Sequence, residues 1–196
     1  MASREKRRLK LIRSAAELFL AKGSAGVSMQ DVAEAANVSR ATLYTYFSSK
    51  DEIFDAAVDG IILSVSDRAK KMLLELPKSA SLQEKLFSIF EAQQKSWFEV
   101  SERQRAIFYF EIWTRSQSMA RERGEMMPFH ALVLEILKQE PTLDYTSPNN
   151  DLPDLGGLSY TIYLAASAIL YADGGAAEKR TLLKTFVDVF TKGLVK

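Results

Sequence analysis

The chain has 196 residues, of which 26 are Lys or Arg and 25 are Asp or Glu, and its 47% hydrophobic content is enough for a sizeable core. It contains no cysteine, which excludes disulfides, thiolate metal sites and thiol catalysis. No run approaches the roughly 20 apolar residues of a membrane span, and the basic start MASREKRRLK leads into an amphipathic helix rather than a signal peptide. We therefore expect a cytoplasmic protein.

The net charge of +1 hides an uneven distribution along the chain. Residues 1–50 carry nine cations against four anions, whereas residues 51–196 carry 17 cations against 21 anions. A basic segment joined to a slightly acidic body suggests that one end of the chain binds a polyanion. A solvated, charged helix face would give the same pattern, so charge alone leaves both interpretations open.

Helical periodicity runs through the sequence without sustained strand-type alternation, which predicts an all-α protein. The first helix is expected over 4–22, stopped by Gly23. Ser28 is the expected N-cap of a short second helix over 29–36, and Asn37 with Val38 forms a tight break. The predicted inward stripes are Leu9, Ile12, Ala16 and Phe19 on the first helix, and Val32, Ala33 and Ala36 on the second.

Ser39 is the expected cap of a third helix over 40–47. Ser49 with Glu52 has the spacing of a capping box, which opens a longer helix to about residue 75, before Pro77. The same capping signature recurs further along the chain, at Ser81 with Glu84 and at Ser101 with Gln104.

The remaining chain predicts three more helices around one long loop. A helix is expected over 121–139, with a restart or kink at Pro128. The segment 140–157 is dense in Pro, Asn, Asp and Gly and reads as a loop. The last two helices are expected over 158–172 and 177–195, and the first of these is apolar nearly all round, so it must be covered on every side.

Two short helices with a tight break, after a basic helix and before a long one, are typical of a helix-turn-helix DNA-binding unit. On the second short helix Leu43 and Phe47 are the expected inward anchors. The outward residues are then Arg40, Ala41, Thr42, Tyr44, Thr45 and Tyr46. Hydroxyl groups can bind phosphates, arginine can read guanine and small methyl groups can contact thymine. The alternative is that Tyr44 and Tyr46 only pack between helices.

The stretch AAELFLAKGSAGVSMQDVAEAANVSRATLYTYFSSKDEIF resembles the DNA-binding domain of the TetR/AcrR family of bacterial regulators, and the motif-level match covers about residues 4–54. The resemblance implies a DNA-binding domain over 1–50 and a helical ligand-binding and dimerisation domain over 51–196. It assigns phosphate contacts to Ser28, Thr42, Tyr44, Tyr46 and Lys50, assigns base contacts to Arg40, Ala41 and Thr45, and includes Ser39 in the DNA-binding set. Ala41 and Thr45 depart from the commonest family pattern, which leaves the operator sequence open.

The resemblance also implies a homodimer formed through roughly 158–172 and 177–195, operator DNA as partner and a small apolar or amphipathic effector. The aromatic and methionine-rich middle of the chain could line an effector pocket or be an ordinary core. Its members are Trp97, Phe98, Phe108, Tyr109, Trp113, Met119, Met126, Met127, Phe129, Tyr160 and Tyr163.

The sequence contains no pattern that predicts catalysis. His130 is the only histidine, so a zinc site of the usual kind is not expected, and we interpret His130 as structural or solvent-facing. We expect no cofactor, no metal and no catalytic residue. The leading hypothesis is a ligand-responsive DNA-binding regulator, with a repressor favoured over an activator. The alternatives are a helical protein-interaction module, an orphan regulator without an effector, and an enzyme built on a helical bundle.

Overall fold

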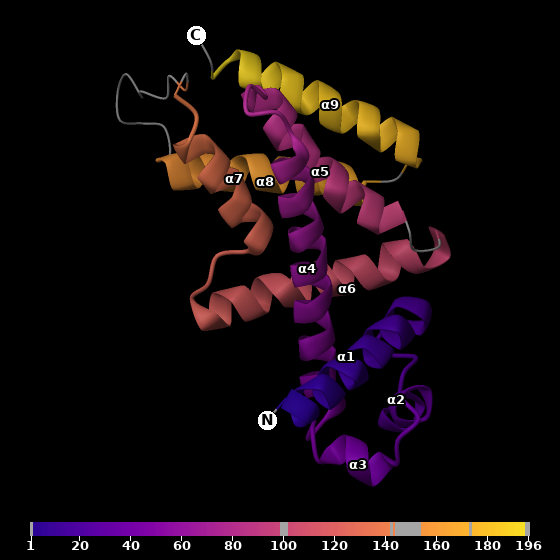
Figure 1. The fold of residues 1–196 in the computed structure, drawn as a ribbon. Helices are drawn as coiled ribbons and strands as arrows, with labels where there is room; N and C mark the ends of the chain where they lie inside the picture. The colour runs from indigo at the N-terminus through magenta and orange to yellow at the C-terminus, as the bar shows by residue number, and fades with distance from the viewer. Residues whose placement is uncertain (1, 99–101, 142, 144–153, 173, 195–196) are drawn as a thin grey trace. The chain divides into compact units, whose positions relative to one another are not determined.

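The computed structural model of the chain describes residues 2–98, 102–141, 143, 154–172 and 174–194, except the side chains of residues 2, 97–98 and 102–110. The described residues form nine α-helices (Figure 1), which confirms the all-α prediction. The helices are α1 (Ala2–Lys22), α2 (Met29–Ala35), α3 (Arg40–Tyr44), α4 (Lys50–Glu75), α5 (Leu82–Phe98), α6 (Glu102–Arg123), α7 (Pro128–Lys138), α8 (Leu155–Tyr171) and α9 (Ala176–Lys192). None of these helices combines the length and the apolar character needed to cross a membrane.

The helices pack into two compact units, and the long helix α4 belongs to both. The first unit comprises residues 1–64 and 100–125, and therefore contains α1, α2, α3, the first part of α4 and α6. The second unit comprises residues 65–99 and 126–196, with the rest of α4 and α5, α7, α8 and α9. The domain boundary predicted after residue 50 separates expected functions and does not coincide with these units, and it stays a prediction.

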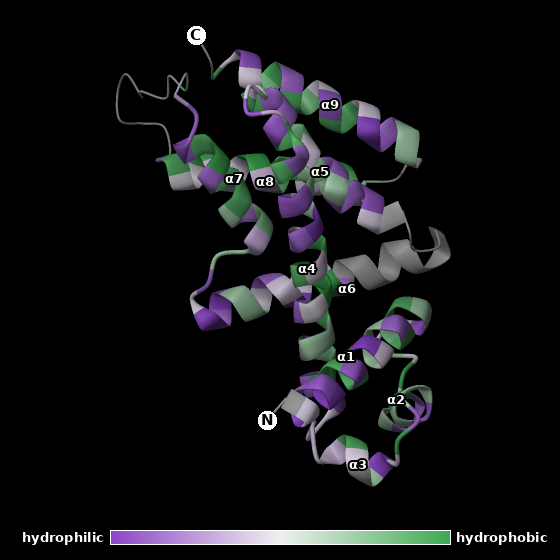
Figure 2. Ribbon diagram, viewed as in Figure 1, coloured by the Kyte–Doolittle hydropathy of each residue, from purple (hydrophilic) through white to green (hydrophobic). Residues whose placement is uncertain are grey.

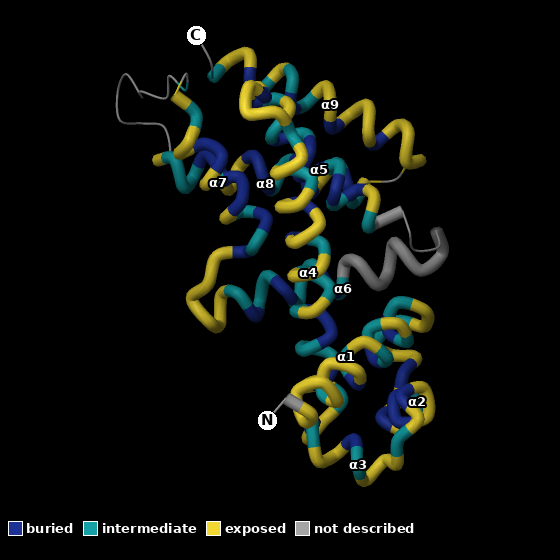
Figure 3. Tube along the Cα trace, in the orientation of Figure 1, coloured by how far each residue is buried: buried dark blue, intermediate teal, exposed yellow. Residues whose placement is uncertain are grey.

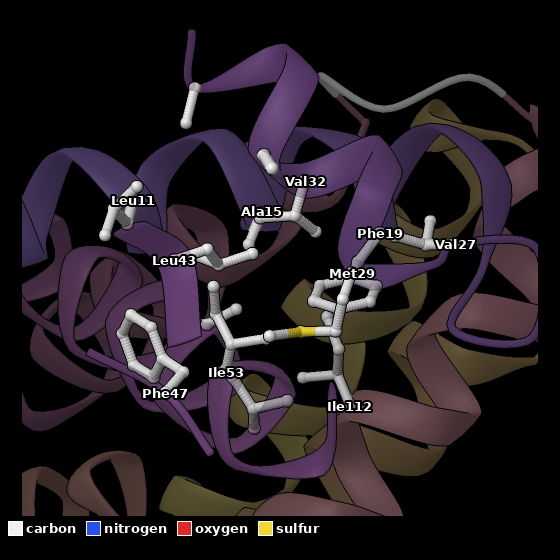
Figure 4. Close-up of a cluster of buried hydrophobic side chains, with 14 of the residues drawn as sticks. Leu11, Ala15, Phe19, Val27, Met29, Val32, Leu43, Phe47, Ile53 and Ile112 are labelled. Carbon is white, nitrogen blue, oxygen red and sulfur yellow. The ribbon is translucent and has the colours of Figure 1, made fainter. Parts of the chain in front are cut away.

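The core of the first unit is built around the inward stripe of α1 (Figure 4). Leu11, Ala15 and Phe19, spaced four residues apart, are at most 1% exposed, and they pack with residues of α2, α3, α4 and α6. The predicted stripe was wrong at Leu9, which is 56% exposed. The predicted stripe and the observed one both contain Phe19. The neighbouring helices cover the side of α1 with Leu11 and Ala15, so Ile12 and Ala16 lie at the edge of the core and are only partly buried.

The turn between α1 and α2 depends on two glycines. Gly23 has a φ of 73°, in the left-handed region that glycine adopts most readily, and it ends α1 as predicted. At Gly26 a Cβ atom would lie 2.6 Å from the carbonyl oxygen of Lys22, so only glycine fits there. Asn37, with a φ of 55°, makes the break after α2, in agreement with the expected turn.

The helix-turn-helix segment is shorter than its pattern predicted. α2 ends at Ala35, and α3 ends at Tyr44 rather than at Phe47. The chain continues from α3 as a tightened turn, because the backbone N–H groups of Tyr46 and Phe47 both donate to the carbonyl of Leu43, at 3.0 and 3.1 Å. Phe47 is thereby carried into the core, where it was expected.

The capping predictions have mixed outcomes. At the start of α4, Ser49 Oγ accepts a hydrogen bond from the N–H of Glu52 at 3.1 Å, as expected. The Glu52 carboxylate, however, reaches one residue further back and accepts from the N–H and the hydroxyl of Ser48, at 2.6 and 2.7 Å. The box at Ser81 and Glu84 is confirmed in both directions. Ser101 lies outside the described residues, so the box predicted there has no structural description.

The helix predicted over 121–139 is two helices. α6 ends at Arg123, Gly124 adopts a φ of 66°, and α7 starts anew at Pro128, one of the two alternatives expected for that proline.

In the second unit α7 packs on α8, and α5 packs on α9 and α7. α8 begins at Leu155, three residues earlier than predicted, because Asp154 caps it by accepting from the N–H of Gly157 at 2.7 Å. At its other end, the buried ammonium of Lys179 donates to the carbonyl of Leu170 at 2.8 Å. A cation at a helix C-terminus is favoured by the partial negative charge of the last carbonyls.

α8 is buried along only one face. Figure 2 shows α8 as a predominantly hydrophobic helix, and its inward stripe includes Ile162, Tyr163 and Ala166, each at most 2% exposed. Tyr160, on another side of the helix, is 42% exposed. The second face that the sequence pattern required to be covered is therefore not covered by the described residues of this chain.

Candidate nucleic-acid interface

The outer face of α3 is the best candidate for a binding surface. Leu43 and Phe47 are 0% and 1% exposed and fix the segment to the core, as predicted. Of the other predicted contact residues of this segment, Ser39, Arg40, Ala41, Tyr44 and Thr45 are exposed and Thr42 is half-buried. Tyr46 is also half-buried and packs against the edge of the core. Figure 3 shows α3 with exposed residues along its outer turns.

Three hydroxyl groups on this face are ordered by local hydrogen bonds. Ser39 Oγ caps α3 by accepting from the N–H of Thr42 at 3.0 Å, and it lies 2.8 Å from Thr42 Oγ1. Thr45 Oγ1 donates to the carbonyl oxygen of Thr42 at 2.6 Å. The Thr45 hydroxyl proton is therefore engaged, and its methyl group is the part available for an apolar contact such as a thymine methyl.

Arg40 and Tyr44 form a pair along α3. The Arg40 guanidinium lies 5.5 Å from the centre of the Tyr44 ring, and its Nη2 donates to the Tyr44 hydroxyl at 3.4 Å. Stacking on an aromatic ring restrains the long arginine side chain but leaves most of its five N–H groups free. The pair can therefore present a cation and a hydroxyl together.

Ser28 serves mainly as a helix cap. Its backbone N–H donates to the Asp31 carboxylate at 2.8 Å, and its Oγ accepts from the N–H of Asp31 at 3.2 Å and donates to the same carboxylate. These bonds, the one from the Ser28 side chain first, lower the pKa of Asp31 below its ordinary value. Because the only hydroxyl proton of Ser28 is engaged, a phosphate bound there must compete with Asp31.

Lys50 is fixed to the turn between α1 and α2. Its Nζ donates to the carbonyl oxygen of Ser24 at 3.0 Å, which engages one of the three N–H donors of the ammonium group. The N–H of the same serine donates to Glu111 Oε2 of α6 at 3.2 Å. One residue in a turn thus connects α4 with α6, and two donors of Lys50 remain for a phosphate.

Two arginines of α6 bind two aspartates of α4 within the first unit. Arg115 donates from Nε and Nη2 to the two carboxylate oxygens of Asp55, both at 2.6 Å. Arg123 binds Asp59 in the same bidentate way, at 3.2 and 2.8 Å. These hydrogen bonds are the main cause of the raised pKa of each guanidinium. Sequence reasoning did not find these pairs because their members lie about 60 residues apart.

Two arginines of α1 are further residues that sequence reasoning missed. The Arg4 guanidinium lies 5.7 Å from the centre of the Tyr46 ring, and that of Arg8 lies 5.1 Å from the centre of the Phe47 ring. The cationic face of this helix was recognised from the sequence, but the aromatic partners were not. A correct inward stripe would have placed both arginines, because Arg8 and Arg4 lie three and seven residues before Leu11 and so share its side of the helix.

The aromatic residues proposed for an effector pocket do not all belong to one unit. Met119 is buried in the core of the first unit, whereas Met127, Phe129 and Tyr163 are buried in the second. Met126 and Tyr160 are 45% and 42% exposed. The side chains of Trp97, Phe98, Phe108 and Tyr109 lie outside the described residues.

His130 joins α7 to α8. Its Nε2 atom lies 2.9 Å from Ser159 Oγ and 3.3 Å from the carbonyl oxygen of Gly156, and its ring lies 5.2 Å from that of Tyr160. Since Ser159 Oγ donates its single proton to Gly156 at 2.7 Å, it must accept from His130, and Nε2 therefore carries a proton. These contacts agree with the first of the two interpretations made from the sequence, structural or solvent-facing. Among the described side chains, no group of three or more His, Asp or Glu residues could hold a metal ion.

Comparisons with known proteins agree with this geometry. Residues 11–57 match the family described as bacterial regulatory proteins, tetR family. Over 70 residues the chain is 34% identical to the HTH-type transcriptional regulator YvaF of Bacillus subtilis, and this match spans 28% of the chain and only 37% of that relative. The similarity is therefore confined to one part of this chain and to little more than a third of the relative.

Two solved structures are similar over nearly the whole chain. One is a protein from Mesorhizobium loti described as a TetR-family transcriptional regulator, with a TM-score of 0.69, 15% identity and 98% coverage of both chains. The other is the fatty acid degradation regulator FadR from Bacillus halodurans, with a TM-score of 0.68, 14% identity and coverage of 92% of this chain and 94% of that one. At these identities the likeness shows that the fold is shared.

Proposed function

Because this chain belongs to the TetR family of bacterial regulatory proteins, we propose that it is a transcriptional repressor that a small effector molecule releases from operator DNA. The observation that carries the proposal is the outer face of α3. A five-residue helix, anchored by its buried Leu43 and by Phe47 of the following turn, presents hydroxyl groups and an arginine outward, in a basic part of the chain. Such a helix suits the major groove, where arginine reads base edges and hydroxyls hold phosphates.

The proposed roles follow the chemistry of each side chain. Arg40, Ala41 and Thr45 contact base edges. Thr42, Tyr44, Tyr46 and Lys50 contact phosphates, and Ser39 orients Thr42 by the hydrogen bond between them. Ser28 contacts a phosphate only if its hydroxyl exchanges Asp31 for the DNA, so we rank its contribution below that of Lys50.

A homodimer formed through α8 and α9 fits this function, because two recognition helices must reach successive major grooves about 34–36 Å apart. The open face of α8 supports the interface, with Tyr160, Leu164 and Ala168 at a spacing of four residues and at least partly exposed. On α9, Leu182 is 45% and Val189 66% exposed, and Phe186 between them is half-buried. Apolar residues in this arrangement favour a self-complementary interface with a second copy.

The proposed effector is a small apolar or amphipathic molecule bound by the part of the chain after residue 50. α4 links its action to DNA, because it starts beside the reading helix and continues into the second unit. The pairs Asp55–Arg115 and Asp59–Arg123 fasten the first part of α4 to α6. By linkage, an effector that weakens DNA binding must itself bind more weakly to the DNA-bound protein, by the same factor.

Selection from a random pool of duplexes tests the proposal without knowledge of the operator. The purified chain is expected to enrich one sequence with approximate twofold symmetry. Fluorescence anisotropy should then show tight binding to the selected duplex and weak binding to a scrambled one, with affinity falling steeply as salt rises, because phosphate contacts displace counterions. A protein-interaction module predicts no enrichment and no salt-dependent binding to either duplex, and that result would contradict the proposal.

The ligand response needs a second measurement. An effector found by its ability to release the selected duplex should bind the free protein more tightly than the DNA complex, as determined by calorimetry. Equal effector affinity in the two states contradicts a regulatory role for that molecule. A chain that binds the duplex selectively but responds to no effector would be the orphan regulator.

A further inference from the structure

The inward stripe of α1 changes its chemistry towards the start of the chain. Leu11, Ala15 and Phe19 are fully buried. Arg8 and Arg4, three and seven residues before Leu11, lie on the same side of the helix, where Arg8 is half-buried and Arg4 is exposed. The stripe thus extends past the core, where its side chains are cations instead of apolar groups. Figure 1 shows the N-terminus on the side of α1 near α3, in agreement with the contact between Arg4 and Tyr46.

The two arginines contact aromatic rings just after the end of α3. Arg4 stacks over Tyr46 and Arg8 stacks over Phe47, which are consecutive residues of the turn that follows α3. Tyr46 is among the residues proposed to contact a phosphate, whereas Phe47 is buried in the core. The contact at Arg4 therefore reaches the proposed DNA surface, and the contact at Arg8 leads back into the protein.

The two arginines differ in whether a carboxylate of the protein lies near their positive charge. Arg8 acts on Glu52 of α4, and its positive charge helps to lower the pKa of that carboxyl, after the larger contributions of the hydrogen bonds from Ser48. Arg4 forms no ion pair with any residue of the described chain. Arg8 is thus partly compensated within the protein, and Arg4 keeps its full charge for a partner.

We propose that Arg4 and Tyr46 together form a phosphate-binding site, which extends the DNA-contacting surface from α3 to the start of α1. The Arg4 guanidinium lies over the ring at 5.7 Å, and this contact restrains the side chain while it leaves N–H groups for phosphate oxygens. The Tyr46 hydroxyl supplies a further donor from the turn that follows α3. An anion held between a guanidinium and a hydroxyl accepts charge-assisted hydrogen bonds from both.

This inference rests on the proposed DNA-binding function, so its experiment must separate the two. The probe is the labelled duplex selected from the random pool, and its affinity is measured by anisotropy at several salt concentrations. The variant is Arg4→Ala. The matched control is Arg13→Ala, which removes the same charge from an exposed position of α1 that lies off the inward stripe. Circular dichroism melting confirms that each variant is folded.

Arg4→Ala is expected to weaken binding by about tenfold, because a hydrogen bond to a charged group is lost. It should also reduce the slope of log affinity against log salt by about 0.9 for each copy of the chain bound to the duplex. The loss should be similar for selected and scrambled duplexes, because phosphates carry no sequence information. Arg13→Ala should keep the wild-type slope. Tyr46→Phe keeps the ring but removes the hydroxyl, so it should lower affinity with little change in slope.

Two results would overturn the inference in different ways. If Arg4→Ala and Arg13→Ala have equal affinities and slopes while the wild-type protein binds selectively, Arg4 is not a contact residue and the proposed function still stands. If the wild-type protein itself shows no salt-dependent preference for any duplex, the proposed function fails, and the phosphate site fails with it.

Discussion

At the residue scale, the candidate interface combines side chains that are free to bind with side chains already engaged. Arg40 is exposed and contacts Tyr44, whereas Lys50 is half-buried and donates to the carbonyl of Ser24. This difference matters for interpreting mutations, because the loss of an engaged side chain changes both binding and stability. Arg40 and Lys50 therefore make an informative comparison.

The substitution Arg40→Ala should relax sequence preference at one operator position, at a cost of about 1–3 kcal/mol on the preferred base pair. Lys50→Ala should instead weaken binding to all duplexes alike. It should also lower the free energy of unfolding by about 1 kcal/mol, since a hydrogen bond to a partly buried carbonyl is lost. Anisotropy on single-base operator variants and urea unfolding measure the two effects.

Either of two findings would contradict these roles. One is an unchanged affinity of Lys50→Ala for every duplex, which would remove the phosphate assignment. The other is a uniform loss of affinity for Arg40→Ala across all operator variants, which would make Arg40 a phosphate contact rather than a base contact.

Sequence reasoning predicted single residues well where one local rule decided their position. The burial of Leu43 and Phe47 and the caps at Ser28 and Ser39 follow from spacing within a few residues. It was wrong where two similar neighbours competed, as with Ser48 and Ser49 for the Glu52 carboxylate. A correct stripe would have placed Arg4 on the inward side of α1, but its contact with Tyr46 depends on the packing of α1 against the turn after α3, which no local pattern contains.

At the element scale, α6 is fastened to the first part of α4 by charged pairs rather than by apolar contacts alone. The side chains of Arg115 and Asp55 are 35% and 27% exposed, so water screens the pair only in part. Helix ends were predictable where a glycine or a proline marks them, as at Gly23 and Pro128, but not at the end of α3 or the start of α8. The packing of α6 on α4 was not predictable, because side chains about 60 residues apart in the sequence come together only in the folded chain.

We expect a double-mutant cycle of Asp55→Ala and Arg115→Ala to give a coupling energy of about 1 kcal/mol, because a bidentate, partly buried pair exceeds an ordinary surface pair. Urea unfolding of the wild type, both single variants and the double variant measures it. The control cycle removes Asp67 and Lys70, an exposed pair on α4 whose atoms lie 3.7 Å apart. Its coupling should be about 0.3 kcal/mol. Equal couplings in the two cycles would show that α6 is not held by this pair.

At the scale of the whole molecule, the proposed dimer depends on apolar residues that the described part of the chain leaves open. On α9 the buried stripe includes Leu183 and Val187, and Leu182, Phe186 and Val189 lie on an adjoining side. A helix with one stripe in its own core and a second apolar side has a partner surface available. The resemblance to the TetR/AcrR family implied this interface, and it stays a prediction.

The substitution Val189→Asp should shift the protein from dimer to monomer, because it places a carboxylate among apolar side chains that a second copy would bury. Sedimentation velocity at several protein concentrations measures the change. Thr181→Asp adds the same charge at an exposed position of α9 outside this set and should leave the dimer intact. An unchanged association of Val189→Asp would exclude this part of α9 from the interface.

The core of the first unit also determines which residues must accompany the proposed DNA-binding helices α1, α2 and α3 if they are moved into another protein. Ile53, Ala57 and Val58 of α4, with Ile112 and Met119 of α6, belong to the same buried cluster as Leu11 and Leu43. A fragment cut after residue 50 would expose the inner faces of α1 and α3 to water. A chimeric regulator built from this protein would therefore need to carry α6 along with α1, α2, α3 and the start of α4, although α6 lies more than 50 residues further along the chain.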